Sequence, residues 1–273
     1  MKKFFPVFIL LIILCFAGVE AQDTPERWAF IVGIGEYSET ARLEPLPYAM
    51  TDVEAVKKMF MESWAVPEGN IITLLNQEAT MDKIKETITK DLAEKVDEND
   101  TIFIYYNGYG QYNFPDFNGD ETGGSDECIV PYDCEANFPK TYITDDKFTK
   151  WIEKIKGNIV MIMEFDGGYG MADFAGNSSL EDRTIVMSVY NLPGEVALGD
   201  PGLRQSVMTY YLLQVNRELY EDYTGDDELG NLTLQEILDK MSEEIDEYLE
   251  NKGGGQFAVT GKLDTKSLII LNK

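Results

Sequence analysis

Short apolar runs alternate with amphipathic stretches along most of the chain, and this pattern restricts the fold more than any other feature of the sequence. Residues 28–34 form a nearly continuous apolar run, which is typical of a strand buried on both faces. Residues 51–64 place their apolar side chains on one stripe with helical spacing. Strands that alternate with helices predict a mainly parallel sheet covered by helices on both faces.

The same two patterns recur as far as the C-terminus. Further strands are predicted at residues 71–75, 101–106, 159–163, 185–189 and 267–271. Helices are predicted after Thr80 and Thr144, which are suitable N-caps, and at residues 206–219 and 234–249. No internal repeat interrupts the series. The length suits one α/β domain, which we assign to residues 22–273.

The N-terminus has the pattern of a secretory signal peptide. Lys2 and Lys3 precede an apolar stretch at residues 4–16, and Val19-Glu20-Ala21 is a small-x-small cleavage site. We therefore predict that residues 1–21 are removed and that the protein is secreted or extracytoplasmic, with no membrane span after cleavage. The alternative is an uncleaved anchor, although the apolar stretch is shorter than the roughly 20 residues that a span needs.

The chain is strongly acidic, with a formal net charge of −26. Such a charge repels nucleic acid and anionic membrane surfaces, so no nucleic-acid partner is expected. It favours cations or basic peptides as partners. The alternative is that the acidic side chains only keep helix faces solvated.

Two cysteines remain after signal removal, Cys128 and Cys134. An extracytoplasmic location permits a disulfide between them, closed by a tight turn around Pro131. Free thiols are the alternative, and the sequence leaves the choice open.

Two strand ends carry the residues that identify a family. The strand at 101–106 is followed by Asn107-Gly108-Tyr109-Gly110, and the strand at 159–163 by Glu164-Phe165-Asp166-Gly167. These segments resemble the Ser-Gly-His-Gly turn and the Asp-Ser-Cys or Glu-Ala-Cys strand end of caspases and metacaspases. Other matching segments are residues 28–37, 48–53, 116–133, 143–146 and 202–213. The resemblance implies a caspase-like three-layer α/β/α sandwich with a mainly parallel sheet.

Both halves of that family's catalytic dyad are replaced. Tyr109 stands at the histidine position and Asp166 at the cysteine position, and the whole chain contains no histidine. Such peptidases depend on a thiolate paired with an imidazole, and tyrosine, with a pKa near 10, cannot act as a base near neutrality. The resemblance therefore implies a catalytically inactive pseudopeptidase. The backbone N–H of Gly110 could still stand where the family stabilises an oxyanion.

The resemblance also implies a binding pocket. Metacaspases receive a basic side chain on acidic residues, and the matching positions here are Asp52 and Glu164. Two carboxylates so placed could bind arginine or lysine of a protein or basic peptide without cutting it. The alternative is that both carboxylates pair with internal lysines or cap helices. The oligomeric state is left open.

An altered hydrolase is a second hypothesis for function. Glu164 and Asp166 are two residues apart at a strand end, so a regular strand would point them to the same side. Two close carboxylates can act as acid and base. The structural alternative is that Asp166 caps the glycine-rich turn that follows it.

A calcium-dependent structural or interaction role is the third hypothesis. Asp116, Asn118, Asp120 and Glu127 follow the ligand spacing of a calcium loop. Glu121 stands where such a loop needs glycine, and a solvated acidic loop is the alternative. No other cofactor is expected, because the sequence contains no phosphate-cradling glycine loop and no zinc ligand set.

Overall fold

A computed structural model describes residues 24–116, 119, 125–171, 174, 177–192, 199–225 and 229–271. Its centre is a six-stranded sheet in the order β10-β8-β7-β3-β1-β2. These strands are β1 (Arg27–Gly33), β2 (Ile71–Leu75), β3 (Thr101–Asn107), β7 (Asn158–Asp166), β8 (Thr184–Tyr190) and β10 (Gln256–Gly261). All neighbours in the sheet run parallel except β10, which is antiparallel to β8. The predicted mainly parallel sheet is therefore confirmed.

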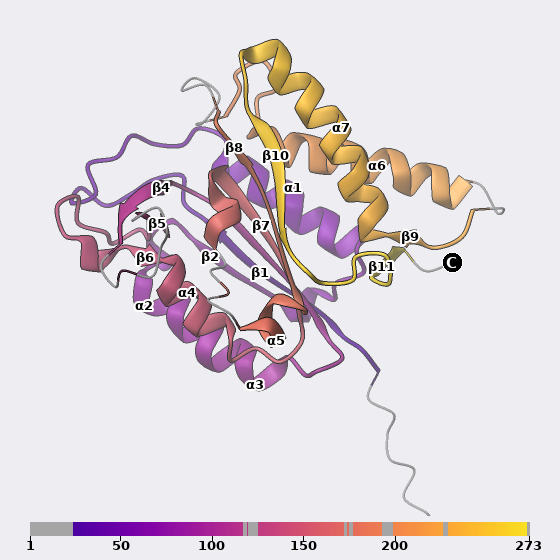
Figure 1. The fold of residues 1–273 in the computed structure, drawn as a ribbon, viewed down its shortest axis with the longest axis horizontal. Helices are drawn as coiled ribbons and strands as arrows, with labels where there is room; N and C mark the ends of the chain where they lie inside the picture. Colours follow the sequence, from indigo (N-terminus) through magenta and orange to yellow (C-terminus); the bar gives the residue numbers. More distant parts are fainter. Residues whose placement is uncertain are drawn as a thin grey trace, which may run out of the picture.

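Helices cover both faces of this sheet (Figure 1). One face carries α1 (Ala49–Glu62), α6 (Val207–Gly225) and α7 (Leu234–Lys252). The other carries α2 (Met81–Glu86), a π-helical turn (Thr87–Leu92), α3 (Ala93–Lys95), α4 (Asp145–Ile152) and the short α5 (Ser178–Glu181). The result is the predicted three-layer α/β/α sandwich.

The strands are apolar on both sides because each side faces a separate core. In β1, Ala29 and Ile31 pack on the side of α1, α6 and α7, whereas Trp28 and Phe30 pack on the other side. All four side chains are buried. A strand with helices on both faces must alternate in this way between two cores, which explains its unbroken apolar sequence.

Two predicted helix starts are confirmed by their caps. Thr80 accepts a hydrogen bond from the backbone N–H of Lys83, and Thr144 accepts one from the N–H of Lys147. Each hydroxyl satisfies a backbone donor that the first helical turn leaves open.

Some strands lie outside the predicted pattern. A separate three-stranded antiparallel sheet consists of β4 (Gly110–Pro115), β5 (Ser125–Ile129) and β6 (Ile143–Thr144). The edge strand β10, which follows the glycines at 253–255, was not predicted. The last predicted strand is present as β11 (Ile269–Leu271), but it pairs with β9 (Leu232–Thr233) outside the central sheet. These strands are short or polar on one side, so they lack the long apolar run that marks the central ones.

The N-terminal prediction remains a prediction. Residues 1–21, assigned to the signal peptide, lie outside the described residues. Among the helices that the structure does describe, none is both long enough and apolar enough to cross a membrane.

The two cysteines are free and buried, so the disulfide that the sequence allowed is not present in the structure. The turn at Pro131 does form, with the N–H of Cys134 donating to its carbonyl oxygen at 3.1 Å. However, Cys128 lies inside β5, paired in register with Thr144, whereas Cys134 packs against Ala41. Burial raises the pKa of the Cys128 thiol to about 12 and that of Cys134 to about 11.

We expect these thiols to be unreactive in the native protein, because the thiolate is the reactive form. A chain that starts at Gln22 should give no colour with Ellman's reagent at pH 8 under native conditions. It should give two thiols per chain in denaturant without reductant. No thiol in denaturant would establish the disulfide instead.

Arg27 ties the C-terminal part of the chain to β1. Its guanidinium donates to the carbonyl oxygens of Trp64 at 2.7 Å and Ile270 at 2.8 Å, and to that of Ile269.

The substitution Arg27→Met leaves these carbonyl groups without donors, so we expect a loss of about 2–4 kcal/mol in the free energy of unfolding. Urea denaturation would measure this loss, with Arg217→Met on the exposed side of α6 as the control. If the two variants were equally stable, Arg27 would not hold the C-terminal part of the chain to β1.

Candidate functional site

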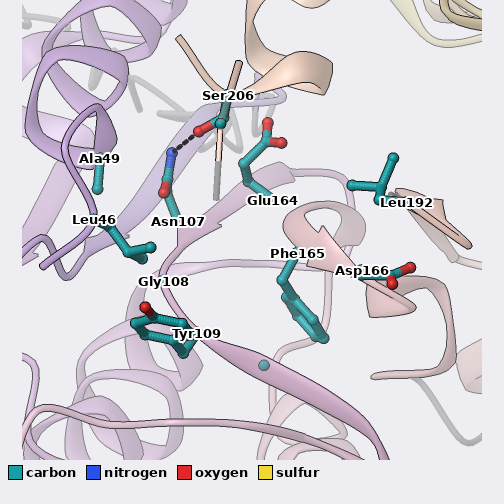
Figure 2. Close-up of a pocket in the computed structure, with 12 residues that line it drawn as sticks. Leu46, Ala49, Asn107, Gly108, Tyr109, Glu164, Phe165, Asp166, Leu192 and Ser206 are labelled. Carbon is teal, nitrogen blue, oxygen red and sulfur yellow. Dashed lines mark hydrogen bonds between the residues drawn. The ribbon is translucent and has the colours of Figure 1, made fainter. Parts of the chain in front are cut away.

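A pocket of about 180 Å³ opens where the parallel strands end. Its walls come from the turn after β3, the end of β7, the segment that leads into α1 and the start of α6 (Figure 2). The carboxyl edge of a parallel sheet is the usual place for a ligand in an α/β fold. Tyr109, Gly110, Glu164 and Asp166, all singled out from the sequence, line this one pocket.

The pairing of β3 with β7 places Asn107 beside Glu164. The side-chain nitrogen of Asn107 lies 3.1 Å from a carboxylate oxygen of Asp52, 3.0 Å from the Tyr105 hydroxyl and 3.3 Å from the Ser206 hydroxyl. Figure 2 shows the contact with Ser206. Asn107 is thus the central donor of a buried polar network under the pocket.

Glu164 forms the other end of this network. Its Oε2 accepts hydrogen bonds from the backbone N–H of Thr209 at 2.7 Å and from the Thr209 hydroxyl at 2.6 Å. That hydroxyl also lies 2.7 Å from the hydroxyl of Tyr105. Burial raises the pKa of Glu164 to about 7, and the charge of Asp52 adds to this, while the Thr209 hydrogen bonds oppose it.

Asp52 lies deeper than the pocket. It is fully buried and accepts hydrogen bonds from the backbone N–H of Ser206 at 3.0 Å and from Gln205 Nε2 at 3.3 Å. Burial raises its pKa although hydrogen bonds from Ser206, Gln205 and Asn107 lower it. The predicted basic pocket therefore needs a correction: only Glu164 lines the pocket. Both carboxylates also satisfy N–H groups at the start of α6, as the capping alternative proposed.

Tyr109 is held by its backbone in the turn after β3. Its N–H donates to the Tyr37 hydroxyl at 2.7 Å, and its carbonyl oxygen accepts from the Tyr106 hydroxyl at 2.7 Å. The rings of Tyr37 and Tyr109 have centroids 5.4 Å apart. Burial, with the charge of Glu44, raises the pKa of Tyr109 further above neutrality. Tyr109 therefore keeps its proton near neutral pH, and its deprotonated form is less available as a base in the fold than in solution.

Asp166 points away from Tyr109, on the side of Leu192 (Figure 2). Burial raises its pKa, and backbone N–H groups of Leu192 and Asn191 lower it. Glu164 points instead toward Ser206, so the two carboxylates do not form the pair expected of neighbours on one side of a strand. The reason is a shift in the pairing of β7 with β8 between Met163 and Asp166, which breaks the regular alternation.

Gly110 starts β4 with the ring of Phe165 against it. A Cβ at this position would lie 2.1 Å from Phe165 Cδ2, so no other residue fits without moving the ring. The oxyanion role of the Gly110 N–H remains a prediction.

The predicted calcium loop lies only partly within the described residues. Asn118 and Asp120 fall outside them, while Asp116 accepts a hydrogen bond from the N–H of Gly119 at 2.5 Å, and the Glu127 carboxyl lies beside Gly170. Within the described ranges, no three histidine, cysteine, aspartate or glutamate residues are grouped so that they could hold a metal ion. Calcium binding remains a prediction.

The sequence of this region matches a known family. Residues 27–174, more than half of the chain, match the model of the metacaspase, peptidase C14 domain. The chain belongs to the metacaspase family. The matched range includes the turn with Tyr109 and the strand end with Asp166, which the resemblance described above assigns to the family's histidine and cysteine. Membership alone does not decide whether this chain is an active peptidase.

Individual metacaspases are similar over part of their length. Metacaspase-1 of Pyricularia oryzae is 26% identical over 152 residues, which cover 54% of this chain and 37% of that protein. Metacaspase-4 of Arabidopsis thaliana is 30% identical over 131 residues, which cover 46% of this chain and 29% of that protein. The chain thus spans about a third of the length of these metacaspases.

A solved structure supports the fold alone. The protein GSU0716 from Geobacter sulfurreducens superimposes with a TM-score of 0.58 at 16% sequence identity. The match covers 90% of this chain and 97% of that one, so the sandwich extends beyond the segment that matches the metacaspase domain.

Sequence reasoning missed the residues that join the two carboxylates. Tyr105 and Asn107 belong to β3, whereas Ser206 directly precedes α6 and Thr209 lies in its first turn. They meet only through the docking of α6 onto the sheet. One signal was available: Asn107 stands where the family turn has serine, directly before Gly108. An amide in place of a hydroxyl adds donors at the centre of the network.

The raised pKa of Glu164 predicts an effect on stability. The unfolded chain loses this proton near pH 4.5, whereas the folded protein keeps it up to about pH 7. The folded state therefore binds more protons between these values, so this residue lowers stability as the pH rises from about 4.5 to 7. In Glu164→Gln this contribution is absent, and the fall in unfolding free energy between pH 5 and pH 8 should shrink by about 1–3 kcal/mol. Urea denaturation at both pH values would show it, with the exposed Glu54→Gln as control. An unchanged pH dependence would contradict a proton on Glu164.

Proposed function

We propose that this member of the metacaspase family is a secreted, catalytically inactive pseudopeptidase whose pocket binds a basic side chain of a protein or peptide. The observation that carries the proposal is the pocket at the carboxyl ends of β3 and β7, whose described lining contains neither a thiol nor an imidazole. The chain has no histidine at all. Cys128 and Cys134 are buried in and beside the small antiparallel sheet, and neither lines the pocket.

The charges around the pocket support binding of a cation. The residues described in its lining include Glu164 and Asp166 but no lysine or arginine. Asp52 lies directly behind Asn107 and Ser206 and adds to the negative potential. A guanidinium or ammonium group would meet complementary charge there, partly screened from water.

The altered hydrolase has less support. A shared acid–base mechanism needs two carboxylates that face one space, and Glu164 and Asp166 point in different directions. Glu164 also has Oε2 engaged by two hydrogen bonds from Thr209, which weakens it as a nucleophile. Binding without cleavage is therefore the function that the geometry favours.

The decisive experiment restores the dyad. The chain from Gln22, with and without calcium, is assayed on fluorogenic peptides that end in arginine or lysine, beside Tyr109→His/Asp166→Cys. We expect no turnover by the natural chain. We expect a gain of at least about a hundredfold in the double variant, because an imidazole and a thiol return to the family positions. Each single substitution serves as a control and should remain silent.

A second readout separates binding from cleavage. Fluorescence anisotropy of a labelled arginine peptide should show saturable binding to the natural chain under the conditions where no cleavage occurs. Turnover by the natural chain that disappears in Asp166→Ala would contradict inactivity and favour the carboxylate mechanism. Neither binding nor turnover would contradict the pocket as a peptide site.

A further inference from the structure

Two buried carboxylates, Asp52 and Glu164, lie beneath the start of α6. Asp52 and Glu164 are 0% and 8% exposed, and no ion pair among the described residues includes either of them. Their only polar contacts that are resolved are hydrogen bonds from amide, hydroxyl and backbone groups. Buried charges are normally paired, so two bare charges in this place are unfavourable.

The two groups are coupled through the same side chains. Asn107 donates to Asp52 and contacts Tyr105, whose hydroxyl contacts Thr209, which in turn donates to Glu164. The charge of Asp52 disfavours a charge on Glu164. A buried carboxyl group beside an ionised one keeps its proton to a higher pH.

Only one member of the pair can meet a ligand. Glu164 lines the pocket, whereas Asp52 lies behind Asn107 and Ser206. Figure 2 shows the Glu164 carboxyl next to Ser206 among the residues that line the pocket. A cation that enters the pocket therefore supplies the partner that the buried pair lacks, and it supplies it to Glu164.

We propose that the pocket binds a cationic side chain by exchanging it for the proton of Glu164, so that binding strengthens as the pH rises through neutrality. The proposal rests on the peptide-binding function proposed above. In the exchange the O–H bond of the carboxyl group breaks and its proton passes to the solvent. The guanidinium or ammonium group keeps all its protons and pairs with the carboxylate that remains.

The surroundings leave few other groups that could titrate with binding. Asp52 faces Glu164 from α1, Tyr105 faces it from β3, and Tyr109 and Asp166 line the same pocket. Burial keeps both tyrosines neutral by raising the pKa of each. The chain has no histidine, so no imidazole contributes near pH 7. Asp145, whose pKa burial raises to about 7, belongs to α4 on the other face of the sheet and provides a control.

The test is calorimetry on the natural chain from Gln22. The probe is a short acetylated peptide amide with one arginine, and the matched control has citrulline, which has nearly the same shape without the charge. Titrations run from pH 5.5 to 8.5 in two buffers of different ionisation enthalpy, which gives the number of protons released. We expect the affinity for the arginine peptide to rise up to about tenfold per pH unit below pH 7 and then to level off. Close to one proton should be released at pH 6, and the citrulline peptide should bind at least about tenfold more weakly at pH 8 without a pH slope.

Two variants identify the residue that releases the proton on binding. Glu164→Gln should bind the arginine peptide weakly at every pH and release no proton, whereas Asp145→Asn should keep the slope of the natural chain. The proton count on the natural chain needs no variant, so it stands even where a variant folds poorly.

The outcomes separate this proposal from the function on which it rests. Arginine binding with equal affinity at pH 5.5 and 8.5 and no released proton would overturn the exchange and leave peptide binding intact. Citrulline binding as tight as arginine binding would also overturn the exchange, because the pocket would then recognise shape alone. No binding of either peptide at any pH would overturn both.

Discussion

The docking of α6 onto the ends of β3 and β7 organises the whole site. A helix start leaves backbone N–H groups without partners and is electropositive, so it needs acceptors where it is buried. Asp52 accepts from the N–H of Ser206, and Glu164 accepts from the N–H of Thr209. This contact joins α1, the sheet and α6, and it fixes the floor of the pocket. It also takes two carboxylates out of water, and the raised pKa values of both follow from that.

The central sandwich could be predicted because its determinants are local. Apolar runs on both faces of a strand, helical stripes and threonine caps each lie within a few residues, as Thr80 and Thr144 show. The smaller sheet of β4, β5 and β6 could not be predicted in the same way. Its strands are short and their burial alternates only partly, so neither composition nor period marks them.

The sequence could predict which residues meet at the pocket but not the directions in which their side chains point. Tyr109, Gly110, Glu164 and Asp166 do meet at one pocket, because the ends of neighbouring parallel strands must share an edge. The directions of the side chains depend on features that no short motif contains. The shift in pairing after Met163 turns Asp166 away from Glu164, and the network around Asn107 draws Asp52 inward.

The absence of histidine and the burial of Glu164 together determine which groups can exchange protons near pH 7. Without imidazole, a chain can exchange protons near pH 7 only through groups whose pKa the fold has moved, and Glu164, at about 7, is such a group inside the pocket. Proton exchange alone does not cut a peptide bond, because a nucleophile must stand beside the base. Asp166 faces away, and Tyr109 holds its proton. What remains is a carboxyl group inside the pocket that can gain or lose charge near pH 7, and this is the basis of the proposed binding of a cationic side chain.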